Sequence, residues 1–476
     1  MKKKIYPVIL SGGIGQRLWP SSTESFPKQF LKINSQNSLL LNTLKRLDKD
    51  LFFPATIIGN FEHRFLIKNE LVTNKINYRS IFLEPMRKNT MASIIICTLD
   101  IVKKDPNANI LVLPADHIIN EKKEFIKIIR NSIKIVNQDL ITTFGIRPNN
   151  PSTSMGYIIS GKKKIGNAFI IKNFIEKPAI KKAKSLIKSK NCFWNSGIFL
   201  FSGKTLLNES SIYSPKTSNL ALKILDNVKD DMIFKVLPEK IFKNFKNIPF
   251  DKAIMEKTKN AVVVPVNFKW FDVGSWKGVW DAVQKDKNKN SINDNVLIDK
   301  VKNSIIWSKN KKIVVIGLDD LVLIEDDDGI LVKKKSSNFD MKSIIKKIDF
   351  RKIEKINTNE TVFRPWGEYK SIYTEKNFLI KILKIYPKSK ISLQYHNKRS
   401  EHWIVVEGCA SVTKDKKTFK LNKDESAYIS KGEIHRLSNE TKKSLVLVEV
   451  QTGSYLKEDD IVRLEDIYGR RIKKIE

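Results

Sequence analysis

The first 280 or so residues alternate short β-branched runs with longer stretches that have the apolar period of a helix, and this alternation constrains the fold most. Apolar runs occupy residues 8–10, 56–59, 110–113 and 142–144. Between the first two runs, residues 38–47 (SLLLNTLKRL) place leucines at helical spacing. Strands that alternate with helices form mostly parallel sheets covered on both faces. The sequence therefore predicts a doubly wound, mostly parallel α/β sheet.

The rest of the chain has a different pattern. Residues 284–294 are rich in Lys and Asn, as a linker is, and residues 295–335 have the pattern of short strands. A charged stretch follows, and the chain from residue 358 onward is dominated by short strands, which predicts an antiparallel barrel or jelly roll. We therefore expect three regions: an α/β domain over residues 1–285, a small β-rich connecting region over 286–357, and a β-barrel over 358–476.

The composition excludes several classes of protein. With 476 residues and 41% hydrophobic side chains, the chain can build large cores, which excludes a disordered or fibrous protein. Lys and Arg number 87 against 51 acids, but only 14 of these bases are Arg, and the lysines are spread along the chain. A nucleic-acid-binding protein concentrates its bases on one face and uses more Arg. We therefore expect no nucleic-acid partner, although the positive field favours phosphorylated substrates.

The sequence also argues against a membrane protein and against an oxidising compartment. The apolar run at residues 5–10 is too short for a secretory signal, and no run approaches the roughly 18 apolar residues of a membrane helix. The three cysteines, Cys97, Cys192 and Cys409, lie far apart and form no CxxC pair. We expect reduced thiols and a cytoplasmic location.

A glycine-rich turn follows the first predicted strand, in the segment SGGIGQRLWP over residues 11–20. Glycines let the backbone turn sharply and approach a polyphosphate, whose charge the amide N–H groups and Arg17 can meet. A P-loop would end in Gly-Lys-Ser/Thr, and a dinucleotide fold would place an acid about 20 residues further on. The chain offers neither, but Lys28 adds a second cation. The pattern favours triphosphate binding without hydride chemistry.

Two aspartates follow apolar runs and are candidates for a metal site. Asp116 ends the run LPAD, and a carboxylate at the carboxyl end of a parallel strand lies over the ligand crevice of an open sheet. Asp272 lies in WFDVGSW. Two carboxylates and substrate phosphates can complete an octahedral Mg²⁺ site. His117 is expected to make a structural hydrogen bond, because phosphoryl transfer mainly needs charge neutralisation and alignment.

Two further segments between these acids carry polar side chains that suit a sugar phosphate. Lys177 precedes a proline, which predicts an extended conformation, and an extended lysine can reach a phosphate group. Glu176 can accept hydrogen bonds from sugar hydroxyls, and Asn195 can both accept from them and donate to them. Taken separately, each is most often a surface or turn residue.

Nine motifs in this order carry a resemblance to a known family: SGGIGQRLWP, PKQF, EPMRKNT, LPADH, MGYI, FIEKP, WNSGIF, PFDKAIMEK and FDVGSW. Over about 280 residues, the chain resembles the sugar-nucleotide pyrophosphorylases and is most similar to bacterial mannose-1-phosphate guanylyltransferases. The resemblance implies transfer of GMP from GTP to mannose 1-phosphate, which gives GDP-mannose and pyrophosphate. Two departures are Lys88, which is inserted before Asn89, and Phe271, where a small polar residue is common; neither removes a charged group.

The resemblance also implies roles for individual residues. It places the GTP phosphates on Gly12, Gly13, Gly15, Arg17 and Lys28, and other contacts to the nucleotide on Glu84, Asn89 and Thr90. It places mannose 1-phosphate on Gly156, Glu176, Lys177 and Asn195, and Mg²⁺ on Asp116 and Asp272. The catalytic set would be Arg17, Lys28, Asp116, Lys177 and Asp272.

The last region carries three of the five histidines, His396, His402 and His435. Gln394 and His396 lie two residues apart, so on a strand they share a face, whereas Glu401 and His402 are neighbours and face opposite sides. We expect Glu401 to point into the barrel and His402 to point outward.

The spacing of these residues resembles the two cupin motifs, with Gln394 in place of the first histidine and Ser430 in place of a proline. The resemblance implies a site for a divalent metal (Zn, Mn, Co or Fe) on Gln394, His396, Glu401 and His435. The alternative is a barrel whose polar residues pair with one another.

The closing run, residues 449–470, resembles the type II phosphomannose isomerases. The resemblance implies interconversion of mannose 6-phosphate and fructose 6-phosphate, with Arg463 and Arg470 as candidates for phosphate binding or catalysis. The base stays unnamed.

Three readings follow for the whole chain: an enzyme with both activities, a guanylyltransferase with a non-catalytic cupin domain, or a non-catalytic sensor of sugar nucleotides. The oligomeric state stays open, with a homo-oligomer as one alternative.

Overall fold

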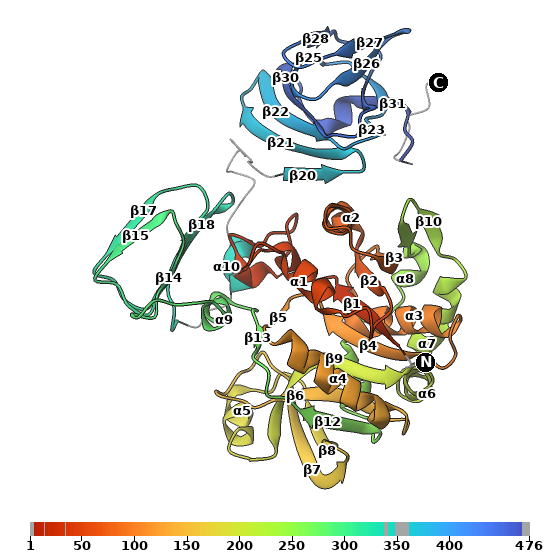
Figure 1. Cartoon of the computed structure of the whole chain (residues 1–476), viewed down its shortest axis with the longest axis vertical. Coiled ribbons are helices and arrows are strands. Elements are labelled where there is room, and N and C mark those ends of the chain that lie inside the picture. The colour runs from red at the N-terminus through yellow and green to blue at the C-terminus, as the bar shows by residue number, and fades with distance from the viewer. Residues whose placement is uncertain (1–3, 14, 34, 338–340, 348–360, 469–476) are drawn as a thin grey trace. The chain divides into compact units, whose positions relative to one another are not determined.

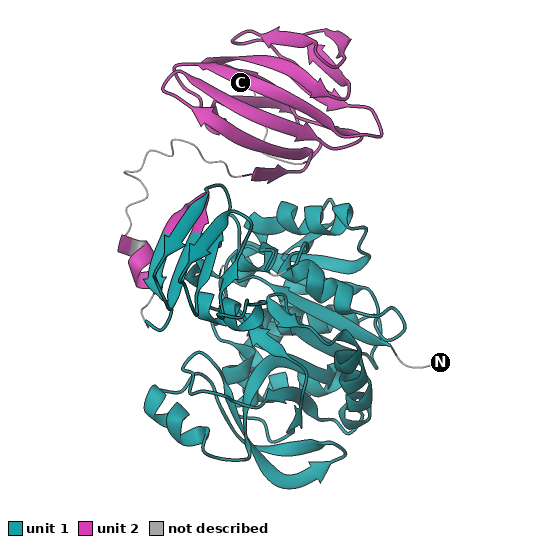
Figure 2. Ribbon diagram, turned by 60° about the vertical axis from the view of Figure 1, so that its left-hand side comes forward, with its two compact units in different colours: residues 1–324, 331–338 teal, residues 325–330, 339–476 magenta. Residues whose placement is uncertain are grey.

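The computed structural model describes residues 4–13, 15–33, 35–337, 341–347 and 361–468. It contains two compact units, one formed by residues 1–324 and 331–338 and the other by residues 325–330 and 339–476 (Figure 2). The expected region boundary at residue 357 lies outside the described residues, and the one at residue 285 stays a prediction. None of the helices in the described part of the chain is long and apolar enough to cross a membrane.

Four parallel strands form the centre of the first unit: β1 (Ile5–Ser11), β2 (Ala55–Asn60), β3 (Tyr78–Glu84) and β4 (Asn109–Pro114) (Figure 1). β1 pairs with β2 on one side and with β4 on the other. All six residues of β2 are buried, as expected for a strand that helices cover on both faces. The carboxyl ends of these strands therefore lie at one edge, where the glycine turn and Asp116 follow β1 and β4.

The complete sheet has eleven strands in the order β10-β11-β3-β2-β1-β4-β9-β6-β12-β8-β7. The remaining strands are β6 (Ile141–Ile146), β7 (Tyr157–Ile165), β8 (Ala168–Ile175), β9 (Cys192–Ser202), β10 (Lys229–Asp231), β11 (Phe234–Val236) and β12 (Ala261–Pro265). The α/β fold is confirmed. Parallel pairing runs through the centre, whereas β9 is antiparallel to both β4 and β6, and β8 is antiparallel to β12. The tight turn at Gly166 (φ 59°) joins β7 to β8 without the crossover that parallel pairing would need.

Helices cover the sheet (Figure 1). The most apolar is α3 (Thr90–Val102), which is buried along most of its length and packs against α6 (Gly203–Tyr213) and α7 (Pro215–Leu225) in one core. The predicted helix at residues 38–47 is α1 (Leu39–Arg46), and Ser38 caps it by accepting a hydrogen bond from the Leu41 amide. The other helices of this unit are α2 (Arg64–Thr73), α4 (Lys122–Val136), α5 (Ile180–Leu186), α8 (Glu239–Phe242) and α9 (Trp276–Ala282).

Short strands follow α9, as the sequence predicts. They form one sheet with the order β14-β16-β18-β19 and a parallel pair, β15 and β17. Their bounds are Ser291–Ile292 (β14), Val296–Asp299 (β15), Ile305–Ser308 (β16), Ile313–Ile316 (β17), Leu321–Asp326 (β18) and Gly329–Lys334 (β19). A small core that includes Val301 and Ile306 holds them together. The short helix α10 (Met341–Lys347) comes after β19.

The expected barrel is confirmed as two antiparallel six-stranded sheets. One has the order β20-β21-β22-β30-β25-β28, with bounds Thr361–Arg364, Gly367–Thr374, Phe378–Ile385, Leu445–Gly453, Arg399–Glu407 and Ser426–Ile429. The other contains β23 (Ser389–Lys390), β24 (Leu393–His396), β26 (Ala410–Lys414), β27 (Lys417–Leu421), β29 (His435–Asn439) and β31 (Ile461–Glu465). Trp403 lies fully buried in the core, and inward residues alternate with outward ones along β22, β25 and β30.

Candidate functional site

The glycine turn after β1 makes close contacts that explain why glycine is needed there. Gly15 has a φ of 75°, and a Cβ at this position would lie 2.2 Å from Cβ of Lys28. A Cβ on Gly12 would lie 2.9 Å from Oε2 of Glu84, whereas Gly13 has open space around it. The missing side chains therefore let the turn pack against Lys28 and Glu84 while Gly13 stays open to a ligand.

Lys28 joins the two aspartates that the sequence singled out. Its Nζ lies 2.7 Å from Oδ2 of Asp116 and 3.3 Å from Oδ1 of Asp272, and its side chain is only 5% exposed. The two carboxylates come from distant parts of the chain and meet at one ammonium group. Both keep an exposed surface, 34% for Asp116 and 26% for Asp272. Asp116 and Asp272 thus lie on the same side of the molecule and can share a ligand.

Charge pairing outweighs burial at this cluster. Burial alone would lower the pKa of the Lys28 ammonium, but the two carboxylates raise it above its ordinary value. Burial would also raise the pKa of Asp116, but Lys28 above all lowers it to about 2. The ammonium and the Asp116 carboxylate therefore stay charged throughout the neutral pH range.

His117 has the structural role that the sequence analysis expects. It opens β5 (His117–Ile119), which pairs with β13 (Trp270–Asp272) so that His117 lies opposite Asp272. The indole nitrogen of Trp270 donates to Nδ1 of His117 at 3.3 Å. Burial lowers the pKa of His117, which keeps the imidazole neutral. The expected hydrogen bond is confirmed, and the pair β5–β13 brings Asp272 to Asp116.

The other predicted nucleotide-binding residues lie near the ends of β1 and β3. Arg17, in the short helix η1 (Gln16–Leu18), is exposed and has no acidic partner among the described residues. Glu84 is buried, accepts a hydrogen bond from Ser93 at 2.5 Å, and has a pKa that burial raises to about 7. Asn89 contacts the Asn247 side chain, and the Thr90 hydroxyl accepts a hydrogen bond from the Phe250 amide. Arg17 is therefore free to meet a phosphate, whereas Asn89 and Thr90 already have protein partners.

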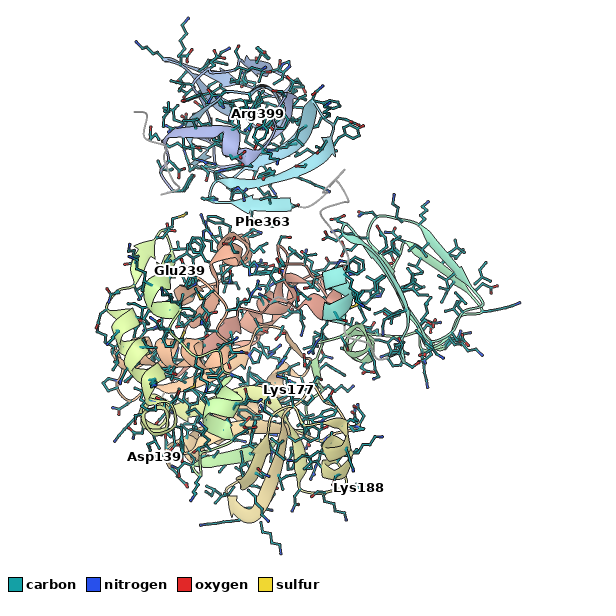
Figure 3. All side chains as sticks on the ribbon, turned by 180° about the vertical axis from the view of Figure 1, so that it is seen from behind. Asp139, Lys177, Lys188, Glu239, Phe363 and Arg399 are labelled. Carbon is teal, nitrogen blue, oxygen red and sulfur yellow. The ribbon has the colours of Figure 1, made fainter. Side chains whose placement is uncertain are left out.

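Three of the predicted sugar-phosphate residues converge. A Cβ on Gly156 would lie 2.6 Å from Oε2 of Glu176 and 3.3 Å from Cβ of Asn195. Lys177 lies 2.6 Å from Glu176 and is more than half exposed. Its side chain is labelled in Figure 3. The prediction of an extended Lys177 is wrong, because its φ is 50° in the tight turn that leads from β8 into α5. The side chain nevertheless remains able to reach a solvent-borne phosphate.

Asp251, which the sequence analysis did not select, completes this cluster. It begins the short helix η4 (Asp251–Met255) and accepts a hydrogen bond from Nδ2 of Asn195 at 2.7 Å. Burial, with the nearby charge of Glu176, raises the pKa of Asp251 to about 7. Oδ1 of Asn195 accepts from Thr143, so the amide is held in one orientation. The sequence hints at the role of Asp251 in holding Asn195 only through the motif PFDKAIMEK, which contains this aspartate.

Three predicted metal ligands meet in the barrel. Ligand atoms of His396, Glu401 and His435 all lie within 4.8 Å of one another, and all three side chains are buried. Nδ1 of His435 lies 2.8 Å from the Glu433 carbonyl, which turns Nε2 toward Glu401 at 3.9 Å. His435 Nε2 and Glu401 Oε2 have no hydrogen-bond partner among the described residues. Unpaired buried donors and acceptors of this kind fit a metal ion rather than a self-paired polar core.

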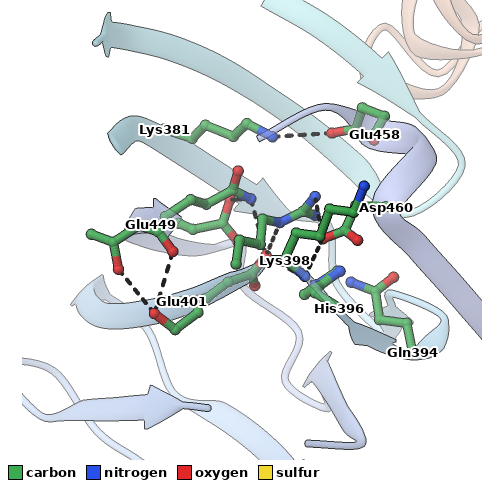
Figure 4. Close-up of polar contacts among 12 residues, drawn as sticks. Lys381, Gln394, His396, Lys398, Glu401, Glu449, Glu458 and Asp460 are labelled. Atoms are coloured by element: carbon green, nitrogen blue, oxygen red, sulfur yellow. Dashed lines mark hydrogen bonds and ion pairs between the residues drawn. The ribbon is translucent and has the colours of Figure 1, made fainter. Parts of the chain in front are cut away.

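The remaining predicted barrel residues lie at the same place or outside the described chain. Gln394 shares β24 with His396 and lies beside it (Figure 4), and its Oε1 accepts from Ser392. His402 is exposed while Glu401 is buried, which confirms the expected alternation. Arg463 lines the cavity next to Glu401. Arg470 lies outside the described residues.

A set of charged residues around Glu401 was not predicted from the sequence. Arg399, only 1% exposed, places Nε 3.2 Å from Glu401, and Gln451 donates both to Glu401 and to Glu449. Burial, together with the charge of Glu401, raises the pKa of Glu449 to about 8, and its carboxyl also accepts from the Trp403 indole. Arg399 and Gln451 both contact Oε1 of Glu401, which His396 Nε2 also approaches at 3.0 Å, so these contacts orient the carboxylate with Oε2 toward His435.

Comparison with known proteins gives a family match for each of the two parts of the chain. A family model described as nucleotidyl transferase matches residues 6–289, and one described as mannose-6-phosphate isomerase C-terminal matches residues 351–466. A mannose-1-phosphate guanylyltransferase from Salmonella muenchen is 38% identical over 98% of this chain and 99% of its own length. This chain belongs to the bacterial mannose-1-phosphate guanylyltransferase family with a C-terminal isomerase-type domain.

Other relatives of this guanylyltransferase family span the chain equally. The alginate biosynthesis protein AlgA of Pseudomonas aeruginosa is 36% identical over 98% of this chain and 97% of its own length. The xanthan biosynthesis protein XanB of Xanthomonas campestris is 37% identical over 98% and 99%. A Thermus thermophilus structure titled mannose-1-phosphate geranyltransferase superposes with a TM-score of 0.65, at 24% identity, over 73% of this chain and 99% of its own. This last likeness supports the nucleotidyltransferase fold.

The raised pKa of Asp251 predicts how its substitution changes stability with pH. Because the folded pKa, about 7, lies above the ordinary value of 3.8, the folded state keeps a proton that the unfolded chain has released. Ionisation of Asp251 therefore costs stability as the pH rises from about 4 to about 7. Asp251→Asn removes this cost and keeps an acceptor for Asn195.

We expect the free energy of unfolding of Asp251→Asn, minus that of the wild type, to rise between pH 4 and pH 7 and then to level off. Urea unfolding at several pH values measures it. Asn208→Gln, at an exposed position of α6 that carries no titratable group, should give a difference that does not vary over this range. A difference for Asp251→Asn that is flat or falls with pH contradicts the assignment.

Proposed function

We propose that the first unit transfers GMP from GTP to mannose 1-phosphate, which yields GDP-mannose and pyrophosphate. The observation that carries this proposal is the meeting of Asp116 and Asp272 at Lys28, next to a glycine turn. The full-length identity with two mannose-1-phosphate guanylyltransferases of Salmonella supports the same activity. The substrates GTP and mannose 1-phosphate follow from those relatives' names and from the cationic, glycine-rich site.

The donor set at the two aspartates fits Mg²⁺. Both are carboxylates with partly exposed side chains, and Lys28, which joins them, packs against the glycine turn at Gly15. Hard oxygen donors of this kind, in small number, suit a magnesium ion that keeps waters and shares substrate phosphates. A bound Mg²⁺ would offset charge on the triphosphate and on the departing pyrophosphate.

The chain's own residues supply the remaining chemistry. An oxygen of mannose 1-phosphate forms a bond to the α-phosphorus of GTP, and the bond from that phosphorus to pyrophosphate breaks. The attacking oxygen is already an anion, so no base is needed. The turn amides near Gly12 and Gly13 and the guanidinium of Arg17 hold the phosphates, and Lys28 fixes the two carboxylates. Glu176, Asn195 and Lys177 hold the sugar phosphate, with Asp251 orienting Asn195.

We also propose that the barrel interconverts mannose 6-phosphate and fructose 6-phosphate. The unpaired atoms of His435 and Glu401, with His396 alongside, support a resident divalent metal, and Gln394 is the proposed fourth ligand. Mixed nitrogen and oxygen donors suit Zn²⁺, Mn²⁺, Co²⁺ or Fe²⁺. Such an ion would polarise the oxygens on C1 and C2 while a proton moves between these carbons. Both proposed activities use nucleotides or sugar phosphates, which agrees with a cytoplasmic location.

Arginine and aspartate substitutions test the transferase. We expect Arg17→Ala and Asp116→Asn each to lower pyrophosphate release from GTP and mannose 1-phosphate about 100-fold or more, because each removes charge that stabilises the transition state. Arg130→Ala, an exposed arginine of α4, is the matched control and should keep wild-type rates. Isomerase activity of the same preparations reports that the protein is intact. Wild-type pyrophosphate release by both variants would refute the assignment, and no release by the wild type would favour a non-catalytic sensor.

Metal removal tests the isomerase. We expect a chelator to abolish conversion of mannose 6-phosphate to fructose 6-phosphate, and added Zn²⁺, Mn²⁺, Co²⁺ or Fe²⁺ to restore it. His435→Gln should lose activity that metal does not restore, whereas His402→Gln, on the outer face of the same barrel, should behave as the wild type. A wild-type protein that carries metal and releases pyrophosphate but does not isomerise would be a guanylyltransferase with a non-catalytic cupin domain.

A further inference from the structure

Two cations in the barrel share one aromatic ring. Nη2 of Arg364 donates to the Tyr369 hydroxyl at 3.2 Å, and the guanidinium carbon lies 5.2 Å from the centre of the Tyr369 ring. Nζ of Lys381 lies 4.7 Å from the same ring centre. Tyr369 therefore holds two like charges near each other. Like charges held in this way create a site that an anion stabilises.

The two cations line the cavity that also contains Glu401 and Gln394. Lys381 on β22 lies opposite Glu449 on β30, which lies opposite Trp403 on β25, and Glu401 is two residues from Trp403 on the same strand. All four side chains therefore point to one face. Strands are about 4.8 Å apart and successive residues rise about 3.4 Å along a strand, so two strands across and two residues along place the backbone of Lys381 about 12 Å from that of Glu401. This separation is on the scale of an extended six-carbon sugar with a terminal phosphate.

The present partner of Lys381 is one that a ligand could replace. Nζ of Lys381 lies 3.0 Å from Oε1 of Glu458 (Figure 4). The Lys381 side chain is 7% exposed, whereas that of Glu458 is 45% exposed and can turn to water at little cost. Arg399, by contrast, is engaged by Glu401, by the Lys457 carbonyl and by Asp460. Among these cations, Lys381 and Arg364 are the ones placed to accept a new anion.

We propose that Arg364 and Lys381 bind the phosphate group of the sugar 6-phosphate, at the end of the cavity away from the metal ligands. The inference rests on the proposed isomerase function and identifies a phosphate subsite for it. Lys381 supplies a point charge, and the Arg364 guanidinium supplies paired donors. Tyr369 sets the distance between them. Glu458 occupies the Lys381 ammonium in the free protein and competes with the phosphate for it.

Lys381→Met tests this site in the full-length protein supplied with divalent metal. We expect KM for mannose 6-phosphate to rise at least tenfold while kcat changes less than threefold. The rate with mannose, which has no phosphate, should keep its kcat/KM, so that the preference for the phosphorylated sugar falls. Lys384→Met is the matched control: it lies on the same strand, is 44% exposed and pairs with Glu368, and should keep wild-type constants. Lys381→Arg should restore KM to within about threefold.

Glu458→Gln gives a result that a purely structural ion pair would not. Removing the competing carboxylate should lower KM for mannose 6-phosphate and strengthen inhibition by inorganic phosphate, opposite to the effect of Lys381→Met. If Glu458→Gln and Lys381→Met weaken binding alike, or if Lys381→Met loses mannose and mannose 6-phosphate turnover equally, the phosphate site is overturned. Arg364→Met, at a half-buried position, carries the same expectation as Lys381→Met if that variant does not fold.

Calorimetric titration with mannose 6-phosphate separates failure of this inference from failure of the isomerase function. A wild type that binds the sugar phosphate without isomerising it refutes the isomerase, whereas tenfold weaker binding by Lys381→Met still supports the site. Equal binding by the wild type and Lys381→Met, or no binding by the wild type, overturns the site. Pyrophosphate release should be unchanged in every one of these variants.

Discussion

The buried ammonium of Lys28 between Asp116 and Asp272 is the interaction on which the rest of the transferase site depends. An ammonium removed from water is costly unless it is paired, and here two carboxylates from distant segments supply the pairing. The contact fixes the glycine turn against η2 (Lys28–Phe30) at Gly15 and fixes β13 against β5. The ion pairs of Lys28 thus hold the end of β1, the end of β4 and the segment before α9 together in one site that contains both acidic and basic side chains.

The barrel uses buried charge in a related way. Glu401 is surrounded by His396, His435, Arg399 and Gln451, and its pKa lies well below the ordinary range because the two histidines and Arg399 outweigh burial. A carboxylate that is charged and oriented before any ligand arrives reduces the reorganisation that binding requires. In each unit, neighbouring cations fix the acidic side chains in place. Asp116 and Asp272 remain partly exposed and Glu401 keeps an unpaired oxygen among the described residues, so each site can still bind a metal.

The sequence revealed those parts of the fold and site that depend on local pattern. The glycine turn, the acids after apolar runs and the alternation at Glu401 and His402 follow from spacing of two to ten residues. The antiparallel direction of β9 depends on which strands become neighbours, and no local pattern carries that information. Asp251 was missed because its role arises only when η4 meets Asn195. Lys381 was missed because alternation along a strand shows which side chains point inward, but it does not show which strand lies beside them.

Whether Asp116 and Asp272 share one metal ion is tested by locating Mn²⁺ through its anomalous scattering in a crystal of the full-length protein with GTP. We expect one ion in the first unit, in contact with a carboxylate oxygen of both Asp116 and Asp272 and with the nucleotide's phosphates. An ion that contacts only one of the two aspartates, or phosphates bound away from the turn at Gly12 and Gly13, would contradict it.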